Sequence, residues 1–89
     1  MEIIWSKPAL DRVAEIADFI AKDSPSQAKR FIKDLIQSIE RLKEFPFSGQ
    51  LVPESPAFRQ TVFRGYRVIY RLQEEVVEIV AIVSPGLSE

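Results

Sequence analysis

Four arginines mark the part of the chain whose side chains are best suited to chemistry. Between Pro46 and Arg71 the sequence has four arginines and one acidic residue, Glu54. A guanidinium group is planar, stays charged, and matches phosphate or carboxylate oxygens with paired hydrogen bonds. The stretch therefore predicts a surface for a polyanion or for an acidic protein. The four candidates for target binding are Arg59, Arg64, Arg67 and Arg71.

Side-chain alternation sorts these residues on an expected strand from Tyr66 to Leu72. Arg67 and Arg71 fall on one face of that strand, and Tyr66 and Tyr70 fall on the other. We expect Arg59, from the neighbouring strand, to line up with Arg67 and Arg71. Several guanidinium groups would then converge on one side of a sheet, with Arg64 at the turn.

Three roles are open for this cluster. In the first, the cluster binds a target, and Tyr66 or Tyr70 adds base stacking or proton transfer. In the second, the cluster binds a partner protein. In the third alternative the arginines serve only structure, because they pair with Glu74, Glu78 or helix carboxylates on the sheet surface.

The residue inventory excludes several kinds of enzyme. The sequence has no cysteine and no histidine, which excludes disulfides, thiolate metal sites and histidine general bases. A zinc enzyme, a cysteine protease and a Ser-His-Asp hydrolase are ruled out. No glycine-rich phosphate loop or nucleophile elbow is present. We therefore expect no metal and no cofactor, and any catalysis would depend on Arg, Lys, Tyr, Ser or carboxylates.

Length and hydropathy predict one small domain. With 89 residues and a net charge of −1, the chain has room for a single domain covering residues 1–89. No apolar run approaches the roughly 20 residues that span a bilayer, and the N-terminus does not resemble a signal peptide. We expect a cytoplasmic protein with no membrane partner.

Two amphipathic helices are expected to support the strands. Ser6 and Pro8 open a helix from about Lys7 to Ala21, in which Leu10, Val13, Ile16, Ala17 and Ile20 make the apolar stripe. Ser24 and Pro25 open a second helix that runs to about Glu44, before Pro46. Its wide apolar stripe comprises Ala28, Phe31, Ile32, Leu35, Ile36, Ile39 and Leu42.

The remaining segments predict a sheet. Proline and glycine indicate a loop from Phe47 to Pro56. We expect one of the phenylalanines in or beside this loop, Phe45, Phe47 or Phe58, to face a partner. Trp5 and most phenylalanines are expected to belong to the core. Short turns force antiparallel pairing of the last three strands, and a frayed tail follows. The fold class is α+β, a two-layer domain ordered strand, helix, helix and three-stranded antiparallel meander. The expected strands are Glu2–Trp5, Phe58–Phe63, Tyr66–Leu72 and Val76–Val83.

Four segments, taken in order, resemble the ParE/RelE toxin superfamily, and its ParE-like branch most closely. They are the opening from Ile4 to Asp11, the helix and its exit from Glu15 to Pro25, the helix ending from Ile39 to Pro46 with Ser48-Gly49, and Arg59 with the strand Gly65 to Arg71. The resemblance covers nearly the whole chain. It implies a RelE/ParE-like fold and a toxin of a type II toxin–antitoxin system.

The resemblance also implies partners. A cognate antitoxin would neutralise the toxin, and operator DNA would be bound only through that antitoxin. A ParE-like toxin inhibits DNA gyrase, which causes growth arrest and plasmid stabilization. A RelE-like toxin instead enters the ribosome and cleaves mRNA, for which Arg67, Tyr66 and Tyr70 would be the catalytic candidates. No residue in the sequence identifies the antitoxin-binding surface.

The sequence after Val83 departs from the RelE pattern. RelE-type catalysis uses an arginine and often a tyrosine after the last strand, but residues 84–89 contain no Arg, Lys, His or Tyr. Arg67 matches the sheet arginine of that set, yet a guanidinium group keeps its protons and is a poor proton shuttle. We therefore favour a gyrase inhibitor that is not an enzyme. The alternatives are a ribosome-dependent endoribonuclease and a degenerate, non-toxic antitoxin-binding module.

Overall fold

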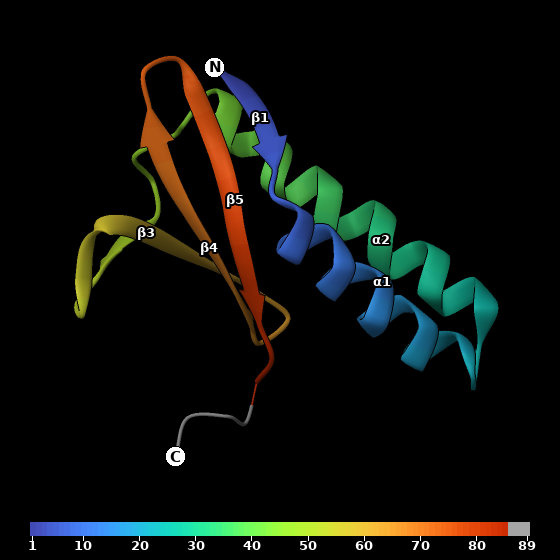
Figure 1. Ribbon diagram of the computed structural model, residues 1–89. Helices are drawn as coiled ribbons and strands as arrows, with labels where there is room; N and C mark the ends of the chain where they lie inside the picture. Colours follow the sequence, from blue (N-terminus) through green and yellow to red (C-terminus); the bar gives the residue numbers. More distant parts are fainter. Residues whose placement is uncertain (86–89) are drawn as a thin grey trace.

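The computed structural model describes residues 1–85 and contains two helices packed on one face of a five-stranded sheet (Figure 1). This arrangement confirms the predicted α+β class. The predicted frayed tail falls largely on residues 86–89, which lie outside the described residues. The elements are β1 (Glu2–Trp5), α1 (Lys7–Ala21), α2 (Pro25–Glu40), the 3₁₀ helix η1 (Arg41–Lys43), β2 (Gln50–Val52), β3 (Ser55–Phe63), β4 (Tyr66–Gln73) and β5 (Val76–Val83).

Both helices begin where the sequence predicts. The Ser6 hydroxyl accepts a hydrogen bond from the Ala9 amide at 3.2 Å, and the Ser24 hydroxyl accepts one from the Gln27 amide at 3.2 Å. These caps satisfy amides that the first helical turn leaves free. A proline follows each cap in the first turn, where its missing N–H costs nothing.

The second helix is shorter than predicted. Its α-helical part ends at Glu40, and η1 then tightens the chain over Arg41–Lys43. The amides of Glu44 and Phe45 both donate to the carbonyl of Arg41. This narrowing turn is a common way to satisfy the last carbonyls of a helix before a proline ends it.

The sheet has the strand order β1-β5-β4-β3-β2, with β1 parallel to β5 and every other pair antiparallel. The prediction of a loop from Phe47 to Pro56 was wrong in part. Gln50–Val52 forms the short edge strand β2, and β3 begins at Ser55 rather than Phe58. Three residues flanked by Gly49 and Pro53 are too few to give a strand signal of their own.

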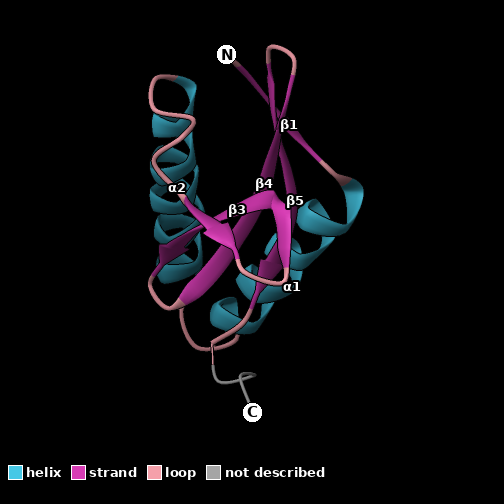
Figure 2. Cartoon of the chain, turned by 90° about the vertical axis from the view of Figure 1, so that its left-hand side faces the viewer, coloured by secondary structure: helices cyan, strands magenta, loops and turns pink. Residues whose placement is uncertain are grey.

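The core lies between the helices and the sheet (Figure 2). Two residues of the predicted helical stripes depart from it, because Leu10 is 52% exposed and Ile36 is 44% exposed. We call the covered side of the sheet the helix face and the other side the open face. The buried core comprises Ala9 and Ile16 of α1, Phe31, Leu35 and Ile39 of α2, Leu42 of η1, and Val68, Tyr70, Val77, Ile79 and Ile82 of the sheet.

Candidate functional site

Arg67 and Arg71 lie on the open face of β4, as alternation predicts. Each is held by a neighbouring strand. Arg67 Nε donates to Gln60 Oε1 of β3 at 2.6 Å, and Arg71 Nε donates to Glu78 Oε1 of β5 at 2.7 Å. The ion pair between Arg71 and Glu78 corresponds to the structural alternative considered for these arginines. The open face therefore presents two oriented guanidinium groups, one of them beside a carboxylate.

Arg59 does not join this pair, which corrects the expectation of a single arginine cluster. Arg59 is paired with Tyr70 across the β3–β4 ladder, and directly opposed residues share a face. Its side chain thus lies on the helix face. There Nη1 donates to the Gly49 carbonyl at 2.8 Å and to the Phe47 carbonyl at 3.3 Å. The guanidinium carbon lies 5.0 Å from the centre of the Phe47 ring, within cation–π range.

Arg64 occupies the turn between β3 and β4, as predicted, with a φ of 50°. Its guanidinium forms an ion pair with Asp34 of α2. The same group lies 5.0 Å from the Phe63 ring centre and 5.9 Å from that of Phe31. Arg64 therefore ties the β3–β4 turn to the helix layer, away from Arg67 and Arg71.

The two tyrosines also lie on the helix face. Tyr70 is fully buried, and its hydroxyl donates to the Pro46 carbonyl at 2.8 Å and accepts from the Gly49 amide at 3.0 Å. Burial raises the pKa of Tyr70 above its ordinary value, while the Gly49 hydrogen bond and the Arg59 charge act in the opposite direction. Tyr66 packs edge-on against Phe31 with ring centres 5.5 Å apart. Neither phenol lies beside the open-face arginines.

Arg59 and Tyr70 together clamp the segment from Pro46 to Gly49. Gly49 is buried, and a Cβ at this position would lie 2.5 Å from the Tyr70 hydroxyl and 2.7 Å from the Gln60 carbonyl oxygen. Only glycine allows this close approach. Sequence reasoning missed the clamp, although a glycine after two aromatic residues and a proline is a signal that could have suggested it.

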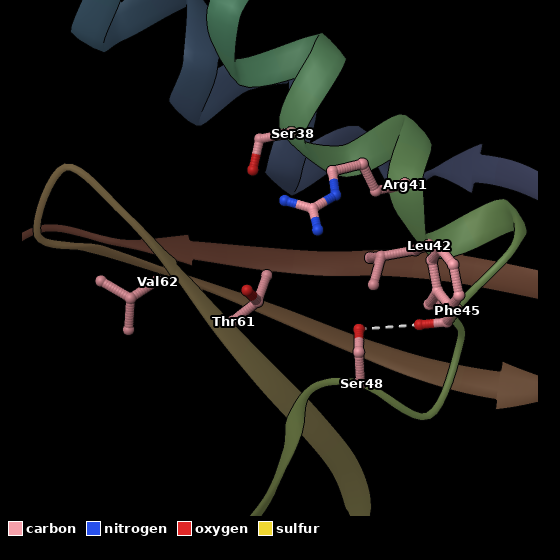
Figure 3. Close-up of a pocket in the computed structure, with 7 residues that line it drawn as sticks. All are labelled: Ser38, Arg41, Leu42, Phe45, Ser48, Thr61 and Val62. Carbon is pink, nitrogen blue, oxygen red and sulfur yellow. Dashed lines mark hydrogen bonds between the residues drawn. The ribbon is translucent and has the colours of Figure 1, made fainter.

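The clamped segment presents aromatic side chains to solvent. Phe45 is 56% exposed and Phe47 is 66% exposed, whereas Phe58 is half-buried. A groove of about 470 Å³ begins at Phe45 and runs between α2 with η1 and the strand β3 (Figure 3). The groove shares Val62 with the open face, but neither Arg67 nor Arg71 lines it.

Two kinds of site are not found within residues 1–85. No group of three or more His, Asp or Glu side chains is arranged to hold a metal ion. None of the helices in this part of the chain has the length and apolar character needed to cross a membrane.

Two solved structures have the same fold as this chain. A chain of the chromosomal ParDE toxin–antitoxin system from P. aeruginosa superposes with a TM-score of 0.83 and 19% identity, covering 97% of each chain. A YoeB/ParE toxin from Agrobacterium tumefaciens superposes with a TM-score of 0.64 and 16% identity, covering 94% of this chain and 98% of that one. At these identities the likeness establishes the fold.

The sequence match identifies the family. The family model described as ParE toxin of type II toxin-antitoxin system, parDE, matches residues 3–85. The chain belongs to this family, which confirms the predicted resemblance. A protein of Sinorhizobium fredii (strain NBRC 101917 / NGR234), described as a candidate toxin Y4kP, is 38% identical over 48 residues. That match covers 54% of this chain and 50% of the relative, so it spans about half the length of each.

Proposed function

We propose that the chain is the toxin of a type II toxin–antitoxin module, that it inhibits DNA gyrase by binding it, and that a cognate antitoxin neutralises it. Membership of the ParE family supports the toxin role. The choice of a protein target over RNA is supported by the chemistry of the open face. A gyrase inhibitor acts where DNA is replicated, so the proposal implies a cytoplasmic protein.

The observation that carries the proposal is the setting of the two open-face arginines. Glu78 lies beside Arg71, and its negative charge opposes the approach of a phosphate. Exposed apolar side chains share this face with the arginines, since Ile4 is 48% exposed and Val62 is 64% exposed. Apolar groups combined with oriented arginines are typical of protein–protein interfaces.

The positions of the tyrosines support the same choice. RNA cleavage needs a group that activates the 2′-hydroxyl and a group that protonates the leaving oxygen. Tyr66 and Tyr70 were the candidates for that role, but both side chains lie on the helix face, across the sheet from Arg67. The arrangement therefore favours binding over ribonuclease chemistry.

The test combines growth with two purified assays. Expression of the chain alone in a bacterial host is expected to arrest growth, and coexpression of the antitoxin from the neighbouring reading frame is expected to restore it. The purified chain should inhibit gyrase supercoiling and leave in vitro translation intact. Growth at the normal rate together with uninhibited supercoiling would refute the proposal. Translation arrest with cut mRNA would instead establish the endoribonuclease alternative.

A charge-matched pair of variants locates the target-binding surface. The Arg67→Gln/Arg71→Gln variant is expected to raise the concentration for half-inhibition of gyrase roughly tenfold or more, because oriented arginines are frequent hot spots. The Lys29→Gln/Lys33→Gln variant removes the same charge from exposed positions of α2 and should inhibit like the unaltered chain. Equal inhibition by both variants would remove the open face from the proposal.

A further inference from the structure

The two open-face arginines differ in the group that holds each of them. Arg67 Nε donates to the neutral amide oxygen of Gln60 at 2.6 Å, whereas Arg71 Nε donates to the carboxylate of Glu78 at 2.7 Å. Glu78 thus neutralises Arg71, while no carboxylate within residues 1–85 forms an ion pair with Arg67. Of the two guanidinium groups, the one on Arg67 keeps its charge available for a target.

Apolar side chains surround Arg67 on the open face. Val62 of β3 and Val83 of β5 are paired with Arg67 on its two sides, so both side chains share its face. Ile69, two residues along β4, lies on the same face by alternation. When a partner covers these apolar groups, water is excluded and the attraction between Arg67 and an opposite charge strengthens. An arginine inside an apolar ring is the usual setting of an interface hot spot.

Gln60 fixes the direction in which the Arg67 guanidinium points. The backbone of Gln60 is paired with Gln50 of β2 on one side and with Ile69 of β4 on the other, so the sheet holds it in place. Its side chain reaches Arg67 diagonally across the β3–β4 ladder. Because Gln60 occupies the Nε–H, the two terminal Nη groups remain for a ligand. They form a fork that matches the two oxygens of a carboxylate.

We propose that Gln60 is a positioning residue for target recognition, which holds Arg67 so that its guanidinium receives the carboxylate of one Asp or Glu side chain of gyrase. Two properties of Gln60 serve this role. Its amide oxygen orients Arg67, and its neutrality leaves the positive charge to the target. Arg71, which Glu78 neutralises, contributes less to binding. The inference rests on the proposed function, because it names the group of the target that the open face recognises.

The surroundings of Arg67 favour a single protein carboxylate over other groups. A lysine or arginine of the target would be repelled, and a neutral side chain would leave a covered charge without a partner, which is costly. A DNA backbone carries phosphates along its whole length. It would bring further negative charge toward Glu78 and would leave the apolar side chains of Val62 and Val83 without apolar partners. An acidic side chain within an apolar protein surface satisfies both the charge and its rim.

The concentration for half-inhibition of gyrase supercoiling tests the role of Gln60. Gln60→Glu keeps an acceptor for Arg67 Nε but neutralises Arg67, so it is expected to raise this concentration roughly tenfold or more. If Gln60 served only the fold, Gln60→Glu would keep the hydrogen bond and inhibit like the unaltered chain. Arg67→Gln should also cost roughly tenfold or more, and Arg71→Gln less than about threefold. Equal losses for the two arginine variants would overturn the inference.

Two further variants separate the position of the charge from its amount. Gln60→Glu/Glu78→Gln exchanges the neutral and the charged partner, keeps both arginines and leaves the net charge unchanged, yet it should inhibit as weakly as Gln60→Glu. Gln50→Glu adds the same charge at the exposed position opposite Gln60, one strand further from Arg67. It should change the half-inhibition concentration less than about threefold, because an exposed charge is screened. Thermal melting of each variant establishes that it is folded.

Calorimetric binding to gyrase in the absence of DNA identifies the source of the recognised oxygen atoms. Gln60→Glu should bind roughly tenfold or more weakly than the unaltered chain even without DNA. A difference that appears only when DNA is present would assign Arg67 to a phosphate and overturn the inference. Full inhibition by folded Gln60→Glu, or by the exchange variant, would also overturn it and leave the proposed function intact. A chain that neither binds gyrase nor inhibits supercoiling overturns both.

Discussion

Removing the Tyr70 hydroxyl tests whether the clamp stabilises the fold. The Tyr70→Phe substitution keeps the buried ring and deletes one oxygen, which donates to the Pro46 carbonyl at 2.8 Å and accepts from the Gly49 amide at 3.0 Å. Gly49 is buried, so its amide would lose its partner without gaining water. An unsatisfied buried polar group costs about 1–3 kcal/mol.

The expected loss of stability is large for a chain of this size. We expect the free energy of unfolding to fall by about 2 kcal/mol, near the middle of that range. For a domain of 60–100 residues each kcal/mol lowers the melting temperature by about 4–8 °C, so a decrease of roughly 8–16 °C should follow. Urea unfolding followed by circular dichroism measures the same change as a lower midpoint with an unaltered slope.

Tyr66→Phe provides the matched control. Tyr66 lies on the same strand and face, and its hydroxyl makes no hydrogen bond to another residue within the described part of the chain. Its deletion should change the free energy of unfolding by no more than about 0.5 kcal/mol. Equal stabilities for Tyr70→Phe and Tyr66→Phe would refute the reasoning, because the clamp would then contribute nothing beyond the packing of the ring.

Three further predictions concern the same residues and the open face. Burial raises the folded-state pKa of Tyr70 above its ordinary value of 10.0, so the stabilising contribution of the protonated phenol is fully present below pH 10.0 and is lost as pH rises through the folded-state pKa. The difference in free energy of unfolding between the unaltered chain and Tyr70→Phe, measured by urea unfolding, should therefore stay constant below pH 10.0 and narrow above it. Gly49→Ala should destabilise the chain by about 1–3 kcal/mol. The loss should be smaller in the Tyr70→Phe background, because the 2.5 Å contact between the new Cβ and the Tyr70 hydroxyl disappears with that hydroxyl. Additive losses of stability in thermal melts of the single and double variants would contradict this prediction. Arg71→Gln should cost less than about 1 kcal/mol, because the Arg71 and Glu78 side chains are 42% and 27% exposed, and a larger loss in urea would show that the ion pair stabilises the fold.

Most of the elements could be predicted because local signals agreed with the fold. The caps at Ser6 and Ser24, each followed by proline, located the starts of both helices. The Arg64-Gly65 turn located the β3–β4 hairpin, where the φ angles of 50° and 86° favour the two-residue turn typical of hairpins. β2 was missed because its pairing with β3, rather than any pattern in Gln50–Val52, makes it a strand.

The buried helix surface was predicted less well than its periodicity suggested. Leu10 fits the apolar stripe of α1 but is half exposed, whereas Ala9 is fully buried. A small residue is buried where the helix approaches the sheet closely, and helical spacing alone does not reveal which neighbour determines that approach. The 3₁₀ turn at the end of α2 was missed for a similar reason, since spacing continues smoothly through Leu42.

The position of Arg59 follows from information that the sequence already contains. A two-residue turn at Arg64-Gly65 places Phe63 opposite Tyr66, and counting outward from this pair places Arg59 opposite Tyr70. Opposed residues share a face, so Arg59 belongs with the buried tyrosine and not with Arg67. The count separates two kinds of arginine before any contact is known. Arg59 and Arg64 connect the sheet to neighbouring segments, and Arg67 and Arg71 stay on the open face, where a target can reach them.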